Sequence, residues 1–177
     1  MIKKTVIETP IGMMVAGATK EGLCLLEFSE RKSLNSEMEE IASLLETTVE
    51  EGSNKNIRMV KKQLKEYFKG KRKEFTIPLL TPGSDFQKSV WNELLRIPFG
   101  TTRTYHEQAE SLNNPGSVRA VAHANASNRI AIVIPCHRVI GADGHLVGYG
   151  GGLERKQWLL DHEKKYSGKP VDLNLFQ

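Results

Sequence analysis

The sequence predicts an α/β protein of the α+β kind, in which a small antiparallel sheet with helices precedes a mostly helical domain containing a helix-turn-helix. Two observations support this class. Short runs of apolar and β-branched residues occupy most of the first 28 positions, with Pro and Gly turns between them. Further along, apolar residues recur at helical spacing, and two segments begin with a capping box.

Three short strands are expected at the start of the chain, over residues 4–8, 11–18 and 23–28. Turn residues separate them, with Gly12 in the first turn and Gly22 in the second. Consecutive strands joined by such short turns pair in an antiparallel sheet.

Two amphipathic helices are expected after the strands, one over residues 35–46 and one from residue 57 to a stop at Gly70. The polar stretch 50–56 between them is typical of a loop. Residues 75–79 alternate apolar side chains with others and include a proline, which predicts an edge strand.

The stretch LTPGSD is the expected linker. The first domain then covers residues 1–81, the second covers 82–166, and a polar tail covers 167–177. The second domain opens with a helix, because Ser84 and Gln87 have the spacing of a capping box.

A helix-turn-helix is expected inside the second domain. Thr104 and Glu107 form the second capping box and open a short helix, after which NNPG supplies a turn. Residues 117–126 continue as a helix of small residues in which Arg119 is the one long cation. Composition alone leaves two interpretations in balance: a smooth helix that is buried, or one that presses against DNA with Arg119 projecting.

The composition narrows the classes of protein. Among 177 residues, 25 Lys and Arg against 21 Asp and Glu give a net charge of +4, a mild indication of an anionic partner. No apolar stretch approaches the roughly 20 residues of a membrane span, and the start lacks the apolar core of a secretory signal. We therefore expect a cytoplasmic protein without membrane association, whose two cysteines stay reduced.

The two cysteines differ in their surroundings. Cys24 lies in an apolar run with no histidine or second cysteine nearby, which favours a buried thiol over a metal site. Cys136 follows Pro135 in the sequence IPCHRV, directly before His137. A histidine beside a cysteine can favour the thiolate, which is the nucleophile.

The spacing favours a nucleophilic Cys136 over a buried one. In an extended strand, neighbouring side chains point to opposite faces, so His137 could not touch Cys136 directly. Either the chain turns after Pro135, or the proton passes through a water. Glu163 is a candidate to orient the histidine, as in a Cys-His-acid relay.

Four stretches between residues 84 and 163 carry a resemblance to a known family: FQKSVWNELLRIPFGTTRTY, GSVRAVAHANASN, IPCHRVI and GYGGGLERKQWLLDHE. With them, the chain resembles the O6-alkylguanine-DNA alkyltransferases. The stretches TPIG and GLCLLEF extend the resemblance more loosely into the first domain, which it implies to be ribonuclease H-like.

The resemblance implies direct-reversal DNA repair. Such a protein flips O6-alkylguanine, and with it O4-alkylthymine, out of double-stranded DNA from the minor groove. It transfers the alkyl group irreversibly to its own cysteine in a single turnover, as a monomer, with no cofactor and no metal.

The resemblance also implies catalytic roles for the matching residues. Cys136 is the alkyl acceptor, His137 draws its proton through a water, and Glu163 orients His137. Tyr105 rotates the phosphate of the target nucleotide and donates a proton to the ring nitrogen of the base, which is general acid catalysis. Asn128 is the hinge between the recognition helix and an active-site strand.

The pocket and the DNA contacts follow in the same way. The backbone of Cys136 and Val139 accepts hydrogen bonds from the amine of the base, Gly150 N–H faces the base oxygen, and Tyr149 forms a wall. Some relatives have serine or a larger residue in place of Gly150, so this glycine bears on the width of the pocket. The expected DNA contacts come from the small-residue helix: Arg119 fills the gap left in the stack, and Ala120 and Ala122 pack closely in the minor groove.

Two functions of other classes remain open from the residues alone. One is a sensor of alkylated bases without chemistry, which resembles this family but lacks the acceptor cysteine that is present here as Cys136. The other is a cysteine hydrolase that uses Cys136 and His137, for which the sequence offers no visible oxyanion arrangement.

Overall fold

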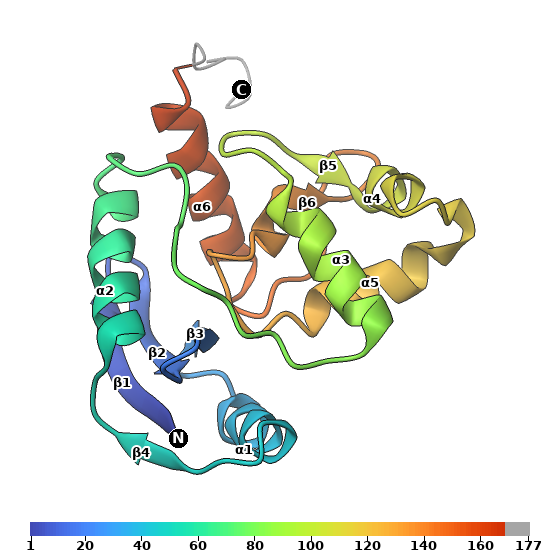
Figure 1. The fold of residues 1–177 in the computed structure, drawn as a ribbon. Helices are drawn as coiled ribbons and strands as arrows, with labels where there is room; N and C mark the ends of the chain where they lie inside the picture. The colour runs from blue at the N-terminus through green and yellow to red at the C-terminus, as the bar shows by residue number, and fades with distance from the viewer. Residues whose placement is uncertain (169–177) are drawn as a thin grey trace.

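The computed structural model describes residues 1–168, so most of the expected polar tail lies outside the described residues. The first part of the chain forms a sheet with two helices, and the second part places helices and a short two-stranded ribbon beside it (Figure 1). The α+β class expected from the sequence is confirmed. None of the described helices is long and apolar enough to cross a bilayer.

The sheet has the strand order β3-β2-β1-β4. Its strands are β1 (Ile2–Thr9), β2 (Gly12–Ala18), β3 (Leu23–Phe28) and β4 (Val49–Glu51). The first three pair antiparallel as expected, whereas β4 runs parallel to β1, within the polar stretch that we expected to be a loop. Backbone pairing needs no apolar side chains, and Lys3 forms an ion pair of 2.7 Å with Glu50 across this edge.

The helices of the first part are α1 (Leu34–Leu44) and α2 (Lys55–Phe68). The Asn54 side chain caps α2 by accepting a hydrogen bond of 2.9 Å from Ile57 N, and Gly70 follows the helix with a φ of +73°.

The edge strand expected over residues 75–79 is absent; Leu79 makes only an isolated bridge to Leu23. Two hydrogen bonds form there, from Leu23 N to Pro78 O and from Leu80 N to Leu23 O. Pro78 has no N–H with which to extend the ladder.

The second part contains four α-helices, two 3-10 helices and one short parallel ribbon among the described residues. The α-helices and ribbon strands follow in chain order. They are α3 (Asp85–Leu95), β5 (Arg103–Thr104), α4 (Tyr105–Ser111), α5 (Val118–Ala126), β6 (Val139–Ile140) and α6 (Leu153–Tyr166). Both expected capping boxes are formed, at the starts of α3 and α4.

The expected helix-turn-helix is confirmed, with α4 and α5 joined by the turn that contains the 3-10 helix Pro115–Ser117. Gln108 and Asn125 join the two helices by donating to each other, at 2.9 and 2.7 Å. Trp91 of α3 donates to the Ala124 carbonyl of α5 at 3.0 Å, so that a third helix supports the pair.

The largest apolar core takes side chains from both parts of the chain, including Leu26 and Tyr67 from the first and Ile132 and Leu159 from the second. Burial of each such side chain contributes about 1.5–3 kcal/mol to folding. The two parts therefore hold each other in place, and residues of the first can take part in a site of the second. The division at residue 82 stays a prediction.

Candidate active site

Cys136 begins a tight turn of the chain instead of ending a strand. The residues before it form turns, with hydrogen bonds of 2.8 Å from Val133 N to Ala131 O and of 3.0 Å from Ile134 N to Ile130 O. Ile132 has a φ of +70°, which an extended strand does not allow. The expected active-site strand is thus a buried coil that leads into the 3-10 helix Cys136–Arg138. Of the two alternatives, the chain does turn after Pro135.

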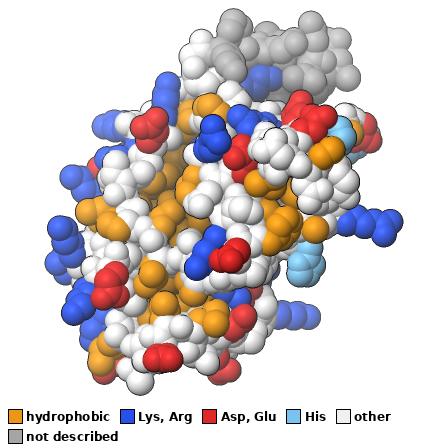
Figure 2. Space-filling model, turned by 45° about the vertical axis from the view of Figure 1, so that its right-hand side comes forward, with side chains coloured by type: hydrophobic (Ala, Val, Ile, Leu, Met, Phe, Trp, Pro, Cys, Tyr) orange, Lys and Arg blue, Asp and Glu red, His pale blue; other side chains and the backbone are white. Residues whose placement is uncertain are grey.

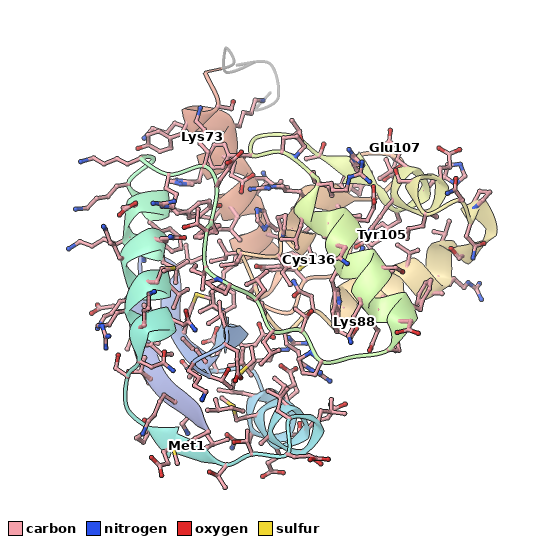
Figure 3. All side chains as sticks on the ribbon, in the orientation of Figure 1. Met1, Lys73, Lys88, Tyr105, Glu107 and Cys136 are labelled. Atoms are coloured by element: carbon pink, nitrogen blue, oxygen red, sulfur yellow. The ribbon has the colours of Figure 1, made fainter. Side chains whose placement is uncertain are left out.

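A pocket of about 400 Å³ opens beside Cys136. Its walls come from α5, from the loop of residues 147–151, and from the first part of the chain. Among the lining residues are Glu27, Arg31, Tyr105, Arg119, Ala122, Asn128, Cys136, Tyr149 and Gly150. Figure 3 places Cys136 in the interior of the molecule, with Tyr105 of α4 on the side of the helical part. On the face drawn in Figure 2, hydrophobic side chains gather in the middle and most lysines and arginines stand at the rim.

The Cys136 thiol is protonated at rest. Burial raises its pKa above the usual value, and this outweighs a hydrogen bond with the Asn128 side chain and the nearby charges of Lys156 and Arg31. Burial also suppresses ionisation of the other thiol: it raises the pKa of Cys24 to about 12, and the Cys24 Sγ lies 3.3 Å from the Gly17 carbonyl. Cys136 therefore needs a base, and Cys24 has none.

His137 supplies a base directly beside Cys136 in the chain. Its Nε2 lies 2.7 Å from Glu163 Oε1, and the ring is fully buried. Burial lowers the pKa of His137, although Glu163 opposes the shift, so the imidazole is neutral near pH 7. Because Nε2 donates to the carboxylate, Nδ1 is the basic nitrogen, and Nδ1 is buried with no hydrogen-bond partner among residues 1–168.

Glu163 is an ionised carboxylate that receives five hydrogen bonds. Oε1 accepts from Tyr67, His137 and Arg138 at 2.9, 2.7 and 2.8 Å, and Oε2 accepts from Arg138 and Gly100 N at 2.8 and 3.2 Å. Burial acts to raise the pKa of this carboxyl, but His137 and Arg138 outweigh it and hold the pKa well below its usual range. The ionised carboxylate therefore orients the N–H donors of both His137 and Arg138.

Asn128 ties the end of α5 to the coil before Cys136. Its Nδ2 donates to the Ile134 carbonyl at 2.9 Å, and its Oδ1 accepts from Ile130 N at 3.0 Å. A change at Cys136 can reach the recognition helix through these two bonds, which is compatible with the expected hinge.

Tyr105 and Lys156 both hold the loop over the pocket. The Tyr105 hydroxyl donates to the Val147 carbonyl at 2.9 Å, and Lys156 Nζ donates to the carbonyls of Val147 and Gly148 at 3.3 and 3.2 Å. Burial raises the pKa of Tyr105, so the phenol keeps its proton. It must leave Val147 before it can donate to a bound base.

The small-residue helix α5 has one buried and one open face. The sequence left open whether this helix is buried or is exposed with Arg119 projecting, and each description fits one of its faces. Val121 and Ala124 are buried, whereas Arg119 and Ala120 are exposed and Ala122 is half-buried. Arg119 and Ala122 also line the pocket, which joins the outer face of the helix to Cys136.

Of the remaining residues that we expected at the pocket, Tyr149 and Gly150 line it and Val139 does not. The Val139 side chain is fully buried in the core and lies outside the pocket lining, so only its backbone could meet a base. Tyr149 and Gly150 line the pocket, and a Cβ on Gly150 would come within 2.8 Å of the Arg31 guanidinium. Arg31 thus occupies the space that a larger side chain at position 150 would need.

Sequence reasoning missed several residues of the site: Glu27, Arg31, Tyr67, Lys156 and the roles of Arg138. Glu27 offered a signal, because a carboxylate inside the apolar run LCLLEF needs a buried partner, and Arg31 is that partner through an ion pair. Lys156 and Tyr67 gave no local signal.

No cluster of metal-ligating residues occurs within the part of the chain that the structure describes.

The fold and site together define a class of protein: a helix-turn-helix protein in which a cysteine lines a pocket bordered by the second helix, next in the chain to a buried histidine that is paired with a glutamate. The family models agree with this class. The model described as "6-O-methylguanine DNA methyltransferase, ribonuclease-like domain" matches residues 2–81, and the one described as its "DNA binding domain" matches residues 85–165. The chain belongs to the 6-O-methylguanine DNA methyltransferase family.

Individual relatives support the same assignment. A methylated-DNA–protein-cysteine methyltransferase of Methanosarcina barkeri is 45% identical over 159 residues, which are 90% of this chain and 95% of that protein. The crystal structure of Mycobacterium tuberculosis O6-methylguanine methyltransferase has a TM-score of 0.80 and 41% identity, with all of both chains covered. A structure of the same bacterial protein in complex with DNA has a TM-score of 0.79 and 40% identity, over 99% of each chain. The chain is thus a DNA repair methyltransferase that moves a methyl group from DNA to a protein cysteine.

Proposed function

We propose that this chain repairs O6-alkylguanine, and O4-alkylthymine with it, by taking the alkyl group onto Cys136 once per molecule. The observation that carries the proposal is the half-buried Cys136 in a pocket beside the buried His137–Glu163 pair. Cys24 lies outside this pocket, and burial raises the pKa of its thiol to about 12.

The reaction begins with removal of the thiol proton. A water bridging Cys136 Sγ and His137 Nδ1 passes the proton to the imidazole, and Glu163 stabilises the imidazolium that forms. The thiolate then attacks the alkyl carbon, forming a C–S bond while the C–O bond breaks and its electron pair goes to the base. Tyr105 donates a proton to the ring nitrogen of the departing base, and the proton that His137 took from the thiol returns through water to the Tyr105 phenolate. The thioether product has no leaving group for water to displace readily, which makes the protein single-turnover.

DNA approaches through the open face of α5. Ala120 and Ala122 let the helix come close in the minor groove, and Arg119 at the pocket entrance fills the space of the flipped nucleotide. Flipping costs a few kcal/mol of stacking and pairing, which this contact offsets.

The Arg119→Ala variant tests the flipping role. We expect repair of O6-methylguanine in duplex DNA to slow by about tenfold or more, since losing roughly 1.4 kcal/mol of support for the flipped state is a factor of ten. Reaction with free O6-benzylguanine needs no flipping and should stay within twofold. Single-turnover rates on both substrates measure this, with Arg96→Ala, a largely exposed cation on another helix end, as the matched control. Equal losses on both substrates would assign Arg119 to the fold or the chemistry.

Alkylation should destabilise the protein. The alkyl group adds volume at Cys136, next to the Asn128 side chain, and overpacking typically costs about 1–3 kcal/mol. For a chain of this size, each kcal/mol lowers Tm by about 2–4 °C. Calorimetry before and after reaction should therefore show a lower Tm for the alkylated protein. The shift should be smaller for the methyl adduct formed with O6-methylguanine DNA than for the benzyl adduct formed with O6-benzylguanine. A Tm that stays constant or rises would mean that the pocket accommodates the group without strain.

A further inference from the structure

The Tyr67 side chain reaches the catalytic pair from the first part of the chain. Tyr67 lies on α2, is fully buried, and donates from Oη to Glu163 Oε1 at 2.9 Å. His137 and Arg138, the other donors to this oxygen, belong to the second part. We propose that Tyr67 is a positioning residue for alkyl transfer, whose hydroxyl tunes the basicity of His137 through Glu163. The proposal rests on the proposed function of Cys136, His137 and Glu163.

The packing around Tyr67 fixes its hydroxyl in one place. Its ring meets those of Phe68, Phe75, Phe99 and His162 at centroid distances of 5.3, 5.5, 6.0 and 5.0 Å. His162 Nε2 also lies 2.8 Å from the Tyr67 carbonyl, which anchors the backbone. Because the ring is held on several sides, removal of the hydroxyl alone leaves the aromatic packing in place.

Glu163 Oε1 shares its charge among three donors, so the loss of one strengthens the others. Without the Tyr67 hydroxyl, more negative charge is available to His137, and the imidazolium form is stabilised. The charged and titratable groups around the pair are Arg138 beside it in the chain, Lys156 and His162 on α6, and Cys136 and Tyr149 at the pocket. Arg138 keeps Glu163 ionised. Loss of the Tyr67 hydroxyl therefore changes the pKa of His137 and does not lead to protonation of the carboxylate.

Removal of the Tyr67 hydroxyl should shift the pH profile of alkyl transfer in a defined direction. His137 must be neutral to accept the thiol proton, so transfer slows as the pH falls through the pKa of His137. The Tyr67→Phe variant raises that pKa, and the acid limb of the rate profile should move to higher pH by about 0.3–1 unit. A 3,5-difluorotyrosine placed at position 67 is a stronger donor, and should move the limb to lower pH.

The experiment measures the single-turnover rate of Cys136 alkylation by free O6-benzylguanine between pH 4.5 and 9 (about the range in which histidine titrates), with the adduct site read by peptide mapping. Tyr166→Phe is the matched control, because it removes a hydroxyl from another tyrosine whose ring meets His162. Opposite displacements of the acid limb by the two Tyr67 variants, with the control at the wild-type position, support the proposal.

Two outcomes overturn it and are distinguishable from failure of the proposed function. If the Tyr67 variants lost rate equally at every pH and the acid limb did not move, Tyr67 would contribute only packing. If both Tyr67 variants moved the acid limb in the same direction, the hydrogen bond from Tyr67 to Glu163 would not be the cause of the change. If the wild type itself gave no adduct on Cys136, the proposed function would fail before Tyr67 was tested.

Discussion

The Cys136→Ser variant is expected to lose alkyl transfer while it still binds DNA containing O6-methylguanine. A serine hydroxyl is many pH units less acidic than a thiol, and His137 is too weak a base to ionise it, so the rate should fall by about a thousandfold or more. The substitution is nearly isosteric and keeps an acceptor beside the Asn128 side-chain amide. The pocket, α5 and Arg119 are then unchanged, so the dissociation constant for DNA should stay within about threefold, well under 1.4 kcal/mol.

Single-turnover assays and a binding titration on the same duplex measure the two effects. Cys24→Ser is the matched control, because its hydroxyl can keep the contact with the Gly17 carbonyl and the residue lies outside the pocket. We expect that variant to transfer at the wild-type rate. A Cys136→Ser protein that still removed methyl groups at a comparable rate would refute the assignment of the nucleophile.

The Glu163→Gln variant is expected to lose both stability and rate. The substitution removes the negative charge from the centre of five hydrogen bonds and leaves the buried Arg138 guanidinium uncompensated. Breaking a buried ion pair from one side costs about 3–5 kcal/mol, or roughly 6–20 °C in Tm. Gln has an NH2 donor in place of one carboxylate oxygen, so position 163 no longer fixes the His137 tautomer, which should slow transfer by about a hundredfold or more.

The stability difference should depend on pH in a defined direction. The pKa of Glu163 is lower in the folded protein than in the unfolded chain, so its contribution is fully present above the ordinary carboxyl pKa. It is lost progressively as the pH falls below that value. The difference in Tm between wild type and Glu163→Gln should therefore be constant near neutrality and shrink below about pH 4.

Glu110→Gln provides the matched control, because Glu110 also pairs with a histidine, His106, at 3.1 Å, but on the exposed surface. Surface pairs of this kind contribute little, so its Tm should change by no more than about 2 °C. If Glu163→Gln were as stable as this control, the carboxylate would not carry the charge that the geometry assigns to it.

The elements that the sequence predicted well are those with local causes. Ser84 with Gln87 and Thr104 with Glu107 satisfy helix ends within four residues, and both helices begin where expected. The errors involve partners far along the chain. Strand β4 exists because residues 49–51 find the free edge of β1, and residues 75–79 miss a strand because they meet β3 at a single bridge. Neither pairing leaves a trace in local composition.

In the site, too, the residues that the sequence predicted lie close together in the chain, and those it missed come from distant segments. Cys136, His137 and Arg138 are adjacent in the chain, so their motif could be read directly, and Glu163 was a candidate to orient the histidine before the family resemblance gave it the same role. Arg31 and Tyr67 come from the first part of the chain and meet the site only when the shared core forms. The buried coil before Cys136 was expected to be a strand, since the left-handed backbone of Ile132 has no signature in an apolar run.

Mass spectrometry of the protein after mixing with an excess of duplex DNA containing O6-methylguanine tests the central claim most directly. Intact mass gives the number of methyl groups per molecule, and peptide mapping gives their position. We expect one methyl group per molecule, on Cys136 and not on Cys24, with guanine restored in an equal amount and no further repair afterwards. Unmodified protein beside unrepaired DNA would indicate a sensor, unmodified protein with continuing turnover would indicate a hydrolase, and a methyl group on any residue other than Cys136 would contradict the assignment of the acceptor.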